Sequence, residues 1–137
     1  MKKRILIVDD SPSWIAFHKN LIMELYPGMF EIVTANSARE ALSIVSFDLT
    51  SPFDVVISDL QMELDYEPKQ AGEWLVENIK NIPCYSHSHI ILISGMYNIE
   101  AIASSLNVEC ISKNILVHNK LMLKFMFEKL MPFLTKV

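Results

Sequence analysis

The sequence of 137 residues has few glycines and few cysteines. Its three glycines, Gly28, Gly72 and Gly95, stand far apart, so it has no glycine-rich loop that could cradle a nucleotide phosphate, and a nucleotide-binding domain is disfavoured. Cys84 and Cys110 form no CxxC motif and have no histidine at zinc-ligand spacing. Two such cysteines are typical of reduced thiols in a cytoplasmic protein.

Long apolar runs and clusters of basic residues are also absent. The first apolar run, at residues 5–8, ends at Asp9, far short of a signal peptide or a membrane span. The chain has 12 Lys and Arg against 16 Asp and Glu, a formal net charge of −4, and no basic stripe to replace phosphate counterions. We therefore expect a cytoplasmic protein that binds neither nucleic acid nor membranes.

Length and composition favour one compact domain. Hydrophobic residues make up 51% of the chain, which is enough for a core without metal or disulfide staples. A second, DNA-binding domain does not fit beside the first. We expect one domain over residues 1–137 and no output domain.

Short apolar runs alternate with helical patterns. Continuous β-branched runs at 5–8, 55–57 and 90–93 are typical of strands buried on both faces, and the mixed runs at 30–34 and 108–111 are typical of edge strands. Helices are expected at 13–25, 38–47, 72–81, 98–106 and 116–134. The alternation predicts an α/β, three-layer doubly wound (βα)5 fold of the flavodoxin-like type. Its five-stranded parallel sheet should have the order 2-1-3-4-5.

Polar residues follow the predicted strands at one edge of the sheet. The first strand ends at Asp9 and Asp10, the third at Asp59, the fourth at Ser94, and the fifth leads to Lys113. Because ligands bind outside the carboxyl ends of such strands, we expect these side chains to converge. Three close carboxylates need a cation, and oxygen ligands with room for water favour Mg²⁺. A carboxylate so placed can accept a phosphoryl group, with Mg²⁺ and the lysine neutralising its oxygens.

These residues lie in motifs that resemble the receiver domain of two-component response regulators, of the single-domain chemotaxis type. The motifs are ILIVDDSP at 5–12, DVVISDLQM at 54–62, ISG at 93–95, and Lys113. The resemblance implies that Asp59 is the phosphoacceptor and that Ser94 and Lys113 bind the phosphoryl group. It also implies the Mg²⁺ ligands, which are the carboxylates of Asp9, Asp10 and Asp59 and the backbone carbonyl of Gln61.

A receiver domain takes its phosphoryl group from a sensor histidine kinase or a phosphotransfer protein, and a downstream protein target reads the changed conformation. It is a signalling phosphoacceptor rather than an enzyme, because it assists only its own phosphorylation and dephosphorylation. The alternative is a phosphorylation-independent interaction module on the same fold. A phosphohydrolase is disfavoured, because Gln61 stands where such enzymes commonly have a second aspartate.

The sequence departs from the family pattern at residues that transmit the signal. Cys110 occupies the place of the switch aromatic three positions before Lys113, so Tyr97 is a candidate replacement. Gln61 and Met96 flank the path of an attacking water in this family. The bulky, apolar Met96 therefore predicts slow loss of the phosphate.

Two segments differ in length from their counterparts in the family. Segment 60–71 is several residues longer and carries Glu63, Asp65 and Glu67. It is either a solvated loop, or a loop that gates access to the pocket or recognises a particular kinase. The stretch from Ser94 to Lys113 is a few residues shorter, which predicts a short or displaced fourth helix.

The last predicted helix has two apolar faces. Its core-facing stripe comprises Met122, Leu123, Met126, Phe127, Leu130, Phe133 and Leu134. Leu121 and Phe125 fall on the opposite face, either as isolated exposed residues or as the interface of a homodimer or a partner helix. Trp14, four residues after Asp10, is near enough to report on the acidic pocket by fluorescence, although packing is the commoner reason for such a ring.

Overall fold

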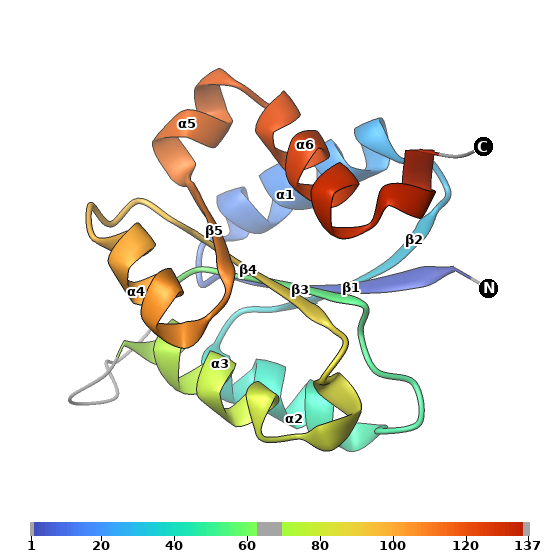
Figure 1. Cartoon of the computed structure of the whole chain (residues 1–137), viewed down its shortest axis with the longest axis vertical. Helices are drawn as coiled ribbons and strands as arrows, with labels where there is room; N and C mark the ends of the chain where they lie inside the picture. The colour runs from blue at the N-terminus through green and yellow to red at the C-terminus, as the bar shows by residue number, and fades with distance from the viewer. Residues whose placement is uncertain (1, 63–69, 136–137) are drawn as a thin grey trace.

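A computed structural model describes residues 2–62 and 70–135, in which strands and helices alternate around one sheet (Figure 1). The strands are β1 (Lys3–Val8), β2 (Phe30–Ala35), β3 (Val55–Ser58), β4 (His89–Ser94) and β5 (Glu109–Ser112). The helices are α1 (Pro12–Leu25), α2 (Ala38–Phe47), α3 (Ala71–Lys80), α4 (Ile99–Leu106), α5 (Lys113–His118) and α6 (Leu121–Leu130). All strand pairs are parallel, in the order β2-β1-β3-β4-β5. The predicted fold class is confirmed.

Two apolar clusters fill the space between the sheet and its helices. Helices α1, α5 and α6 cover one face, and α2, α3 and α4 cover the other (Figure 1). Successive residues of β1 enter different clusters, with Ile5 and Ile7 on the α1 side and Leu6 and Val8 on the α2 side. A strand covered on both faces has no solvent side, which explains the continuous apolar runs.

Helix α1 begins immediately behind the acidic pair at the end of β1. Pro12 is its first residue, where a missing N–H costs nothing. The Ser11 hydroxyl caps the helix by accepting a hydrogen bond from the Trp14 N–H at 3.3 Å. These two residues fix the turn that carries Asp9 and Asp10.

Helix α4 has eight residues, in agreement with the expected short fourth helix. It ends at Asn107, which adopts φ 58° and donates its N–H to carbonyls of the last turn. Asparagine tolerates this left-handed conformation better than most residues do. None of the helices within residues 2–62 and 70–135 combines the length and the hydropathy needed to cross a membrane.

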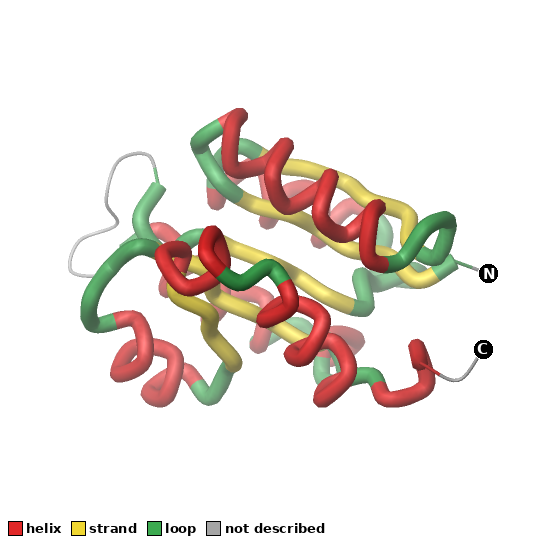
Figure 2. Tube along the Cα trace, turned by 90° about the horizontal axis from the view of Figure 1, so that it is seen from above, coloured by secondary structure: helices red, strands yellow, loops and turns green. Residues whose placement is uncertain are grey.

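The prediction of a single helix over 116–134 is wrong. Helix α5 begins earlier, at Lys113, and ends at His118, and a short loop separates it from α6 (Figure 2). Asn119 leaves helical geometry with φ −145° and ψ 87°. Asparagine is a weak helix former whose side chain competes for backbone groups. Pro132, which disfavours helical geometry in the residue before it, then ends α6 and begins a 3₁₀ turn over Pro132–Thr135.

The apolar stripe of α6 is correct over the helix itself. Five residues pack fully or partly buried against the sheet, namely Met122, Leu123, Met126, Phe127 and Leu130. Phe133 is 50% exposed because the chain turns at Pro132, so its predicted place in the core is wrong. The side chain of Leu134 lies outside the described residues.

Candidate functional site

Strand register brings the acidic residues together. Val8 of β1 pairs with Ser58 of β3, and the Asp59 N–H donates to the Val8 carbonyl at 2.9 Å. Asp9 and Asp59, the next residues on neighbouring strands, therefore lie side by side. One oxygen of each of the carboxylates of Asp9, Asp10 and Asp59 lies within 4.8 Å of the other two.

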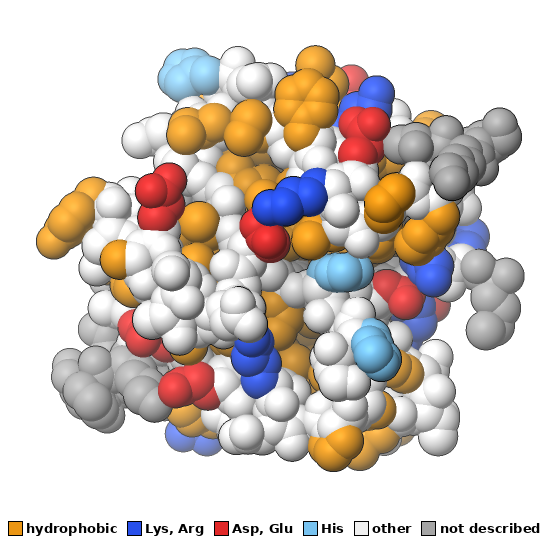
Figure 3. All heavy atoms as spheres, viewed as in Figure 1, with side chains coloured by type: hydrophobic (Ala, Val, Ile, Leu, Met, Phe, Trp, Pro, Cys, Tyr) orange, Lys and Arg blue, Asp and Glu red, His pale blue; other side chains and the backbone are white. Residues whose placement is uncertain are grey.

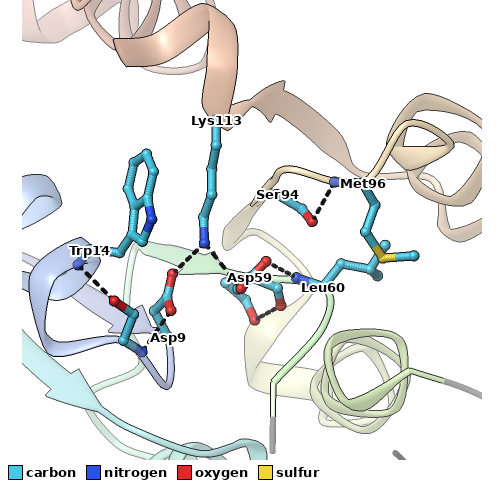
Figure 4. A network of polar contacts seen from close by, with 9 residues as sticks. Asp9, Trp14, Asp59, Leu60, Ser94, Met96 and Lys113 are labelled. Carbon is cyan, nitrogen blue, oxygen red and sulfur yellow. Dashed lines mark hydrogen bonds and ion pairs between the residues drawn. The ribbon is translucent and has the colours of Figure 1, made fainter.

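Lys113 reaches this cluster of acidic side chains from the end of β5. Ser112 at the end of β5 pairs with Ser94 at the end of β4, and Lys113 follows as the first residue of α5. Its Nζ lies 3.0 Å from Asp9 Oδ2 and 3.1 Å from Asp59 Oδ2 (Figure 4). One ammonium group thus bridges two carboxylates from different strands.

The other carboxylate oxygens of Asp9 and Asp59 accept hydrogen bonds from the backbone. Asp9 Oδ1 accepts the N–H of Ser11 at 2.9 Å, and Asp59 Oδ1 accepts the N–H of Leu60 at 2.7 Å. Hydrogen bonds from backbone N–H groups to a carboxylate are strong and rigid. Both acids are therefore oriented before any ligand arrives.

The site is buried on the side of the sheet and exposed at Asp10. Asp9 is 1% and Asp59 8% exposed. Burial raises the pKa of Asp59, and the neighbouring Asp9 acts in the same direction, whereas Lys113 opposes both. Two buried carboxylates repel each other, so the lysine compensates a charge that the protein interior does not solvate.

The donor set fits a hard divalent cation. All three acidic side chains offer oxygen atoms, and the exposure of Asp10 leaves space for water. Mg²⁺ prefers oxygen ligands and keeps part of its water shell, so it matches a half-open carboxylate group. Gln61, two residues after Asp59, is exposed.

Ser94 and Met96 lie on the loop after β4. Ser94 is buried, and its Oγ accepts the N–H of Met96 at 3.2 Å, which leaves the hydroxyl hydrogen to be donated elsewhere. The Met96 side chain is directed toward Leu60, the residue after Asp59 (Figure 4). An apolar group therefore lines the side of the site next to Asp59.

The two residues considered for the switch have different surroundings. Cys110 is half-buried against the cluster beneath α2, α3 and α4, and burial raises the pKa of its thiol. Tyr97 is 98% exposed just before α4. In this conformation the tyrosine ring is in solvent, and the thiol is part of the core wall.

Helix α3 packs against the backbone of the acidic strand at Gly72. The Gly72 N–H donates to the Leu60 carbonyl at 2.8 Å. A Cβ atom at this position would lie 2.4 Å from the Asp59 carbonyl oxygen. Glycine therefore permits a contact that joins the two ends of segment 60–71. The predictions for Glu63, Asp65 and Glu67 lie outside the described residues.

The sequence placed Trp14 near the acidic pocket but did not predict that its ring contacts Lys113. The Lys113 Nζ lies 4.6 Å from the centroid of the Trp14 ring, and the His18 ring lies 5.5 Å from that ring. His18 is 1% exposed, and burial lowers its pKa to about 4. The four-residue spacing of Trp14 and His18, which puts them on one face of α1, is the signal that could have found the pair.

The matches to known proteins agree with this geometry. A family model described as the response regulator receiver domain matches residues 5–121. The chain is 34% identical over 96 residues to a probable cyclic di-GMP phosphodiesterase of Vibrio cholerae serotype O1, covering 70% of this chain and 19% of that protein. It is 34% identical over 76 residues to the two-component response regulator ORR26 of Oryza sativa subsp. japonica, covering 56% and 12%. The chain thus spans about a fifth or less of the length of these relatives.

Solved structures share the arrangement of strands and helices. A putative response regulator from Chloroflexus aurantiacus J-10-fl superposes with a TM-score of 0.76 at 17% identity, covering 95% of this chain and 98% of that one. The phosphorylated cyanobacterial phytochrome response regulator RcpA gives 0.75 at 22% identity, covering 93% of each chain. At these identities the likeness establishes the fold alone. The family match spans β1 to α5 and includes all five polar residues of the site, so the chain belongs to the receiver domain family of two-component response regulators.

Proposed function

We propose that Asp59 accepts a phosphoryl group from a phosphohistidine of a sensor kinase or phosphotransfer protein. The observation that carries the proposal is the bridge from Lys113 to both Asp9 and Asp59 within a cluster of three acids. In the transfer, the bond from phosphorus to the histidine nitrogen breaks and a bond to a carboxylate oxygen of Asp59 forms. No proton needs to leave Asp59, because its carboxylate is the nucleophile.

The side chains divide the work of neutralising the incoming phosphoryl oxygens. Asp9, Asp10, Asp59 and the Gln61 carbonyl are the proposed Mg²⁺ ligands, and the ion supplies positive charge to the transferred group. Lys113, which bridges the two carboxylates, places its ammonium group next to the new phosphoryl oxygens. Ser94 donates its free hydroxyl hydrogen to one of them. Since phosphoryl transfer depends mainly on positioning and charge, these oriented groups are sufficient for it.

Intact-mass measurement with acetyl phosphate and Mg²⁺ tests the proposal. Wild type should gain one phosphoryl group, and Asp59→Asn should gain none. Asp54→Asn is the matched control, because Asp54 directly precedes β3, at the end of the strand opposite to Asp59, and contacts Lys3 and the Arg4 N–H there. A wild type without mass gain, or a D59N variant with an equal gain, would refute the assignment.

Chelation separates the metal's role from that of the protein. Removal of Mg²⁺ should abolish the mass gain, and Asp10→Asn should raise the Mg²⁺ concentration needed for half-maximal phosphorylation. Asp10 is the variant of choice because its exposed side chain is expected to contribute to the metal without holding the core together. Equal phosphorylation with and without Mg²⁺ would contradict the proposed ligand set.

The expected output is a protein contact made in the cytoplasm. Apolar side chains are visible on the surface in the region of α5 and α6 (Figure 3). On α6, Leu121 is 48% and Phe125 55% exposed, so we propose this face as the surface for a homodimer or a downstream target. Replacing both by serine should change the oligomeric state or partner binding, as measured by sedimentation and pull-down. An unchanged result in both would remove this surface from consideration.

The departure at Cys110 keeps a second candidate function in view. The thiol occupies the place of the aromatic switch, so a module that binds its partner independently of phosphate is the alternative. Partner affinity measured for wild type and D59N, each with and without acetyl phosphate, decides between the two. A phosphate-dependent change in wild type alone favours the phosphoacceptor.

A further inference from the structure

The ammonium group of Lys113 has a third neighbour besides the two carboxylates. The Trp14 ring stands beside the lysine side chain, with Nζ 4.6 Å from its centroid (Figure 4). An ammonium group over an indole face is attracted by the negative face of the ring, and the attraction strengthens when water is excluded. The Lys113 side chain is 13% exposed, so little water competes.

The indole is itself held in place. Its ring centroid lies 5.2 Å from that of Phe17 in an edge-on arrangement and 5.5 Å from that of His18. His18 is almost completely buried and carries no positive charge at neutral pH, because its pKa is lowered to about 4. A neutral ring therefore backs the indole, and the position of Trp14 is set by packing on α1.

The two kinds of partner respond differently to a metal ion. A divalent cation held by Asp9 and Asp59 would neutralise the negative charge that attracts Lys113 in this structure. A free lysine side chain has a flexible four-carbon stem and would then sample many positions. The indole face is uncharged, and its attraction for the ammonium group does not depend on the state of the carboxylates.

We propose that Trp14 is the positioning residue of Lys113, and that its ring keeps the ammonium group beside Asp59 when the carboxylates are occupied by a cation. The inference rests on the proposed function of Asp59 as phosphoacceptor. Trp14 takes no part in bond making, and its contribution is to reduce the number of positions that the lysine must give up during transfer.

The test compares ring-containing and ringless variants at this position. Trp14→Phe keeps a π face over Lys113, whereas Trp14→Met and Trp14→Leu keep apolar bulk without one. The first readout is the rate at which the Lys113 amine is acetylated by an N-hydroxysuccinimide ester in Mg²⁺, mapped by mass spectrometry. Lys129, an exposed lysine at the far end of α6, is the internal reference. This readout needs no phosphorylation.

We expect acetylation of Lys113 to be about three- to tenfold faster in both ringless variants than in wild type, as the loss of a partly buried cation–π contact predicts. Trp14→Phe should stay within about twofold of wild type. Trp74→Met, the same change at the tryptophan of α3, is the matched control and should leave the rate unchanged. Denaturation curves establish that each variant is folded, and the second ringless variant serves if the first is not.

The second readout is the phosphorylation rate with acetyl phosphate, which should fall in the ringless variants by a similar factor and recover in Trp14→Phe. If Lys113 in the ringless variants is acetylated at the wild-type rate, the inference is overturned, whether or not Asp59 is phosphorylated. If acetylation rises as expected while wild type gains no phosphoryl group, the proposed function fails and the positioning role of Trp14 stands.

Discussion

Substitution of Gly72 by alanine should disturb the strand end that carries Asp59 more than any other glycine change. Gly72 is the second residue of α3, and its N–H donates to the Leu60 carbonyl. A Cβ placed there would lie 2.4 Å from the Asp59 carbonyl oxygen and 2.7 Å from the Leu60 Cα. Both obstacles are backbone atoms of the strand end, which cannot turn away as a flexible side chain can.

The size of the effect follows from these distances. Ordinary contacts of a Cβ atom begin at 3.4 Å, so the helix and the strand must separate by about 1 Å. Overpacking of this kind costs about 1–3 kcal/mol, and alanine's advantage over glycine in a helix returns at most about 1 kcal/mol. We expect a net loss of about 1–2 kcal/mol, which for a chain of this length lowers the melting temperature by roughly 4–8 °C.

Chemical denaturation gives the free energy, and the acetyl phosphate reaction gives the functional consequence. The displaced Asp59 backbone should slow phosphorylation, because the carboxylate is oriented by the neighbouring Leu60 N–H. Gly95→Ala is the matched control: a Cβ there meets no atom within 4 Å, so stability should change by less than about 1 kcal/mol. A Gly72→Ala variant as stable as wild type would refute the packing argument.

Three further predictions concern charge and water at the site. Burial raises the pKa of Asp59, so the folded chain keeps the Asp59 proton up to a higher pH than the unfolded chain does. Above the pH range in which carboxyl groups usually titrate, the ionised Asp59 therefore lowers the stability of the fold. Without Mg²⁺, Asp59→Asn should therefore be more stable than wild type at pH 7 and equal to it near pH 3 in urea denaturation, and a less stable variant at pH 7 would contradict this. The pH dependence of stability that His18 causes has the opposite sign. Because its pKa is lowered to about 4 in the folded chain, the unfolded chain is protonated first, and stability falls as the pH drops below the usual pKa of histidine. Between pH 7 and pH 5 wild type should lose about 2 kcal/mol more than His18→Met, and parallel curves would exclude His18 as the cause. Met96→Asn should speed the loss of phosphate several-fold by admitting and orienting water, as measured by the decay of the phosphorylated mass, and an unchanged rate would count against obstruction by Met96.

The fold could be predicted because its signals are local. Runs such as 55–57 are apolar on both faces and alternate with stretches of helical spacing such as 38–47, so element type and order follow from the chain itself. The extent of the last helix could not be predicted in the same way. Apolar residues continue at helical spacing across Asn119, and α5 and α6 are separated only because Asn119 departs from helical dihedral angles.

The site could be predicted as a set of residues, since the carboxyl ends of parallel strands must meet at one edge. Its internal contacts could not. That Lys113 bridges Asp9 and Asp59 depends on side-chain directions after the strands end. That Gly72 contacts the Asp59 carbonyl depends on where α3 returns after segment 60–71. Both are tertiary distances that no spacing in the sequence encodes.

The earlier start of α5 changes how the lysine should be understood. With a helix beginning at 116, Lys113 would lie in a loop, where its backbone could move freely. In the structure it is the first residue of α5, while Trp14 lies in the first turn of α1. Both ends of the contact between ammonium and ring are thus attached to helices that pack on the same face of the sheet. A displacement of α5 relative to α1 must change that contact, so the position of the Lys113 ammonium group and the arrangement of these helices are mechanically linked.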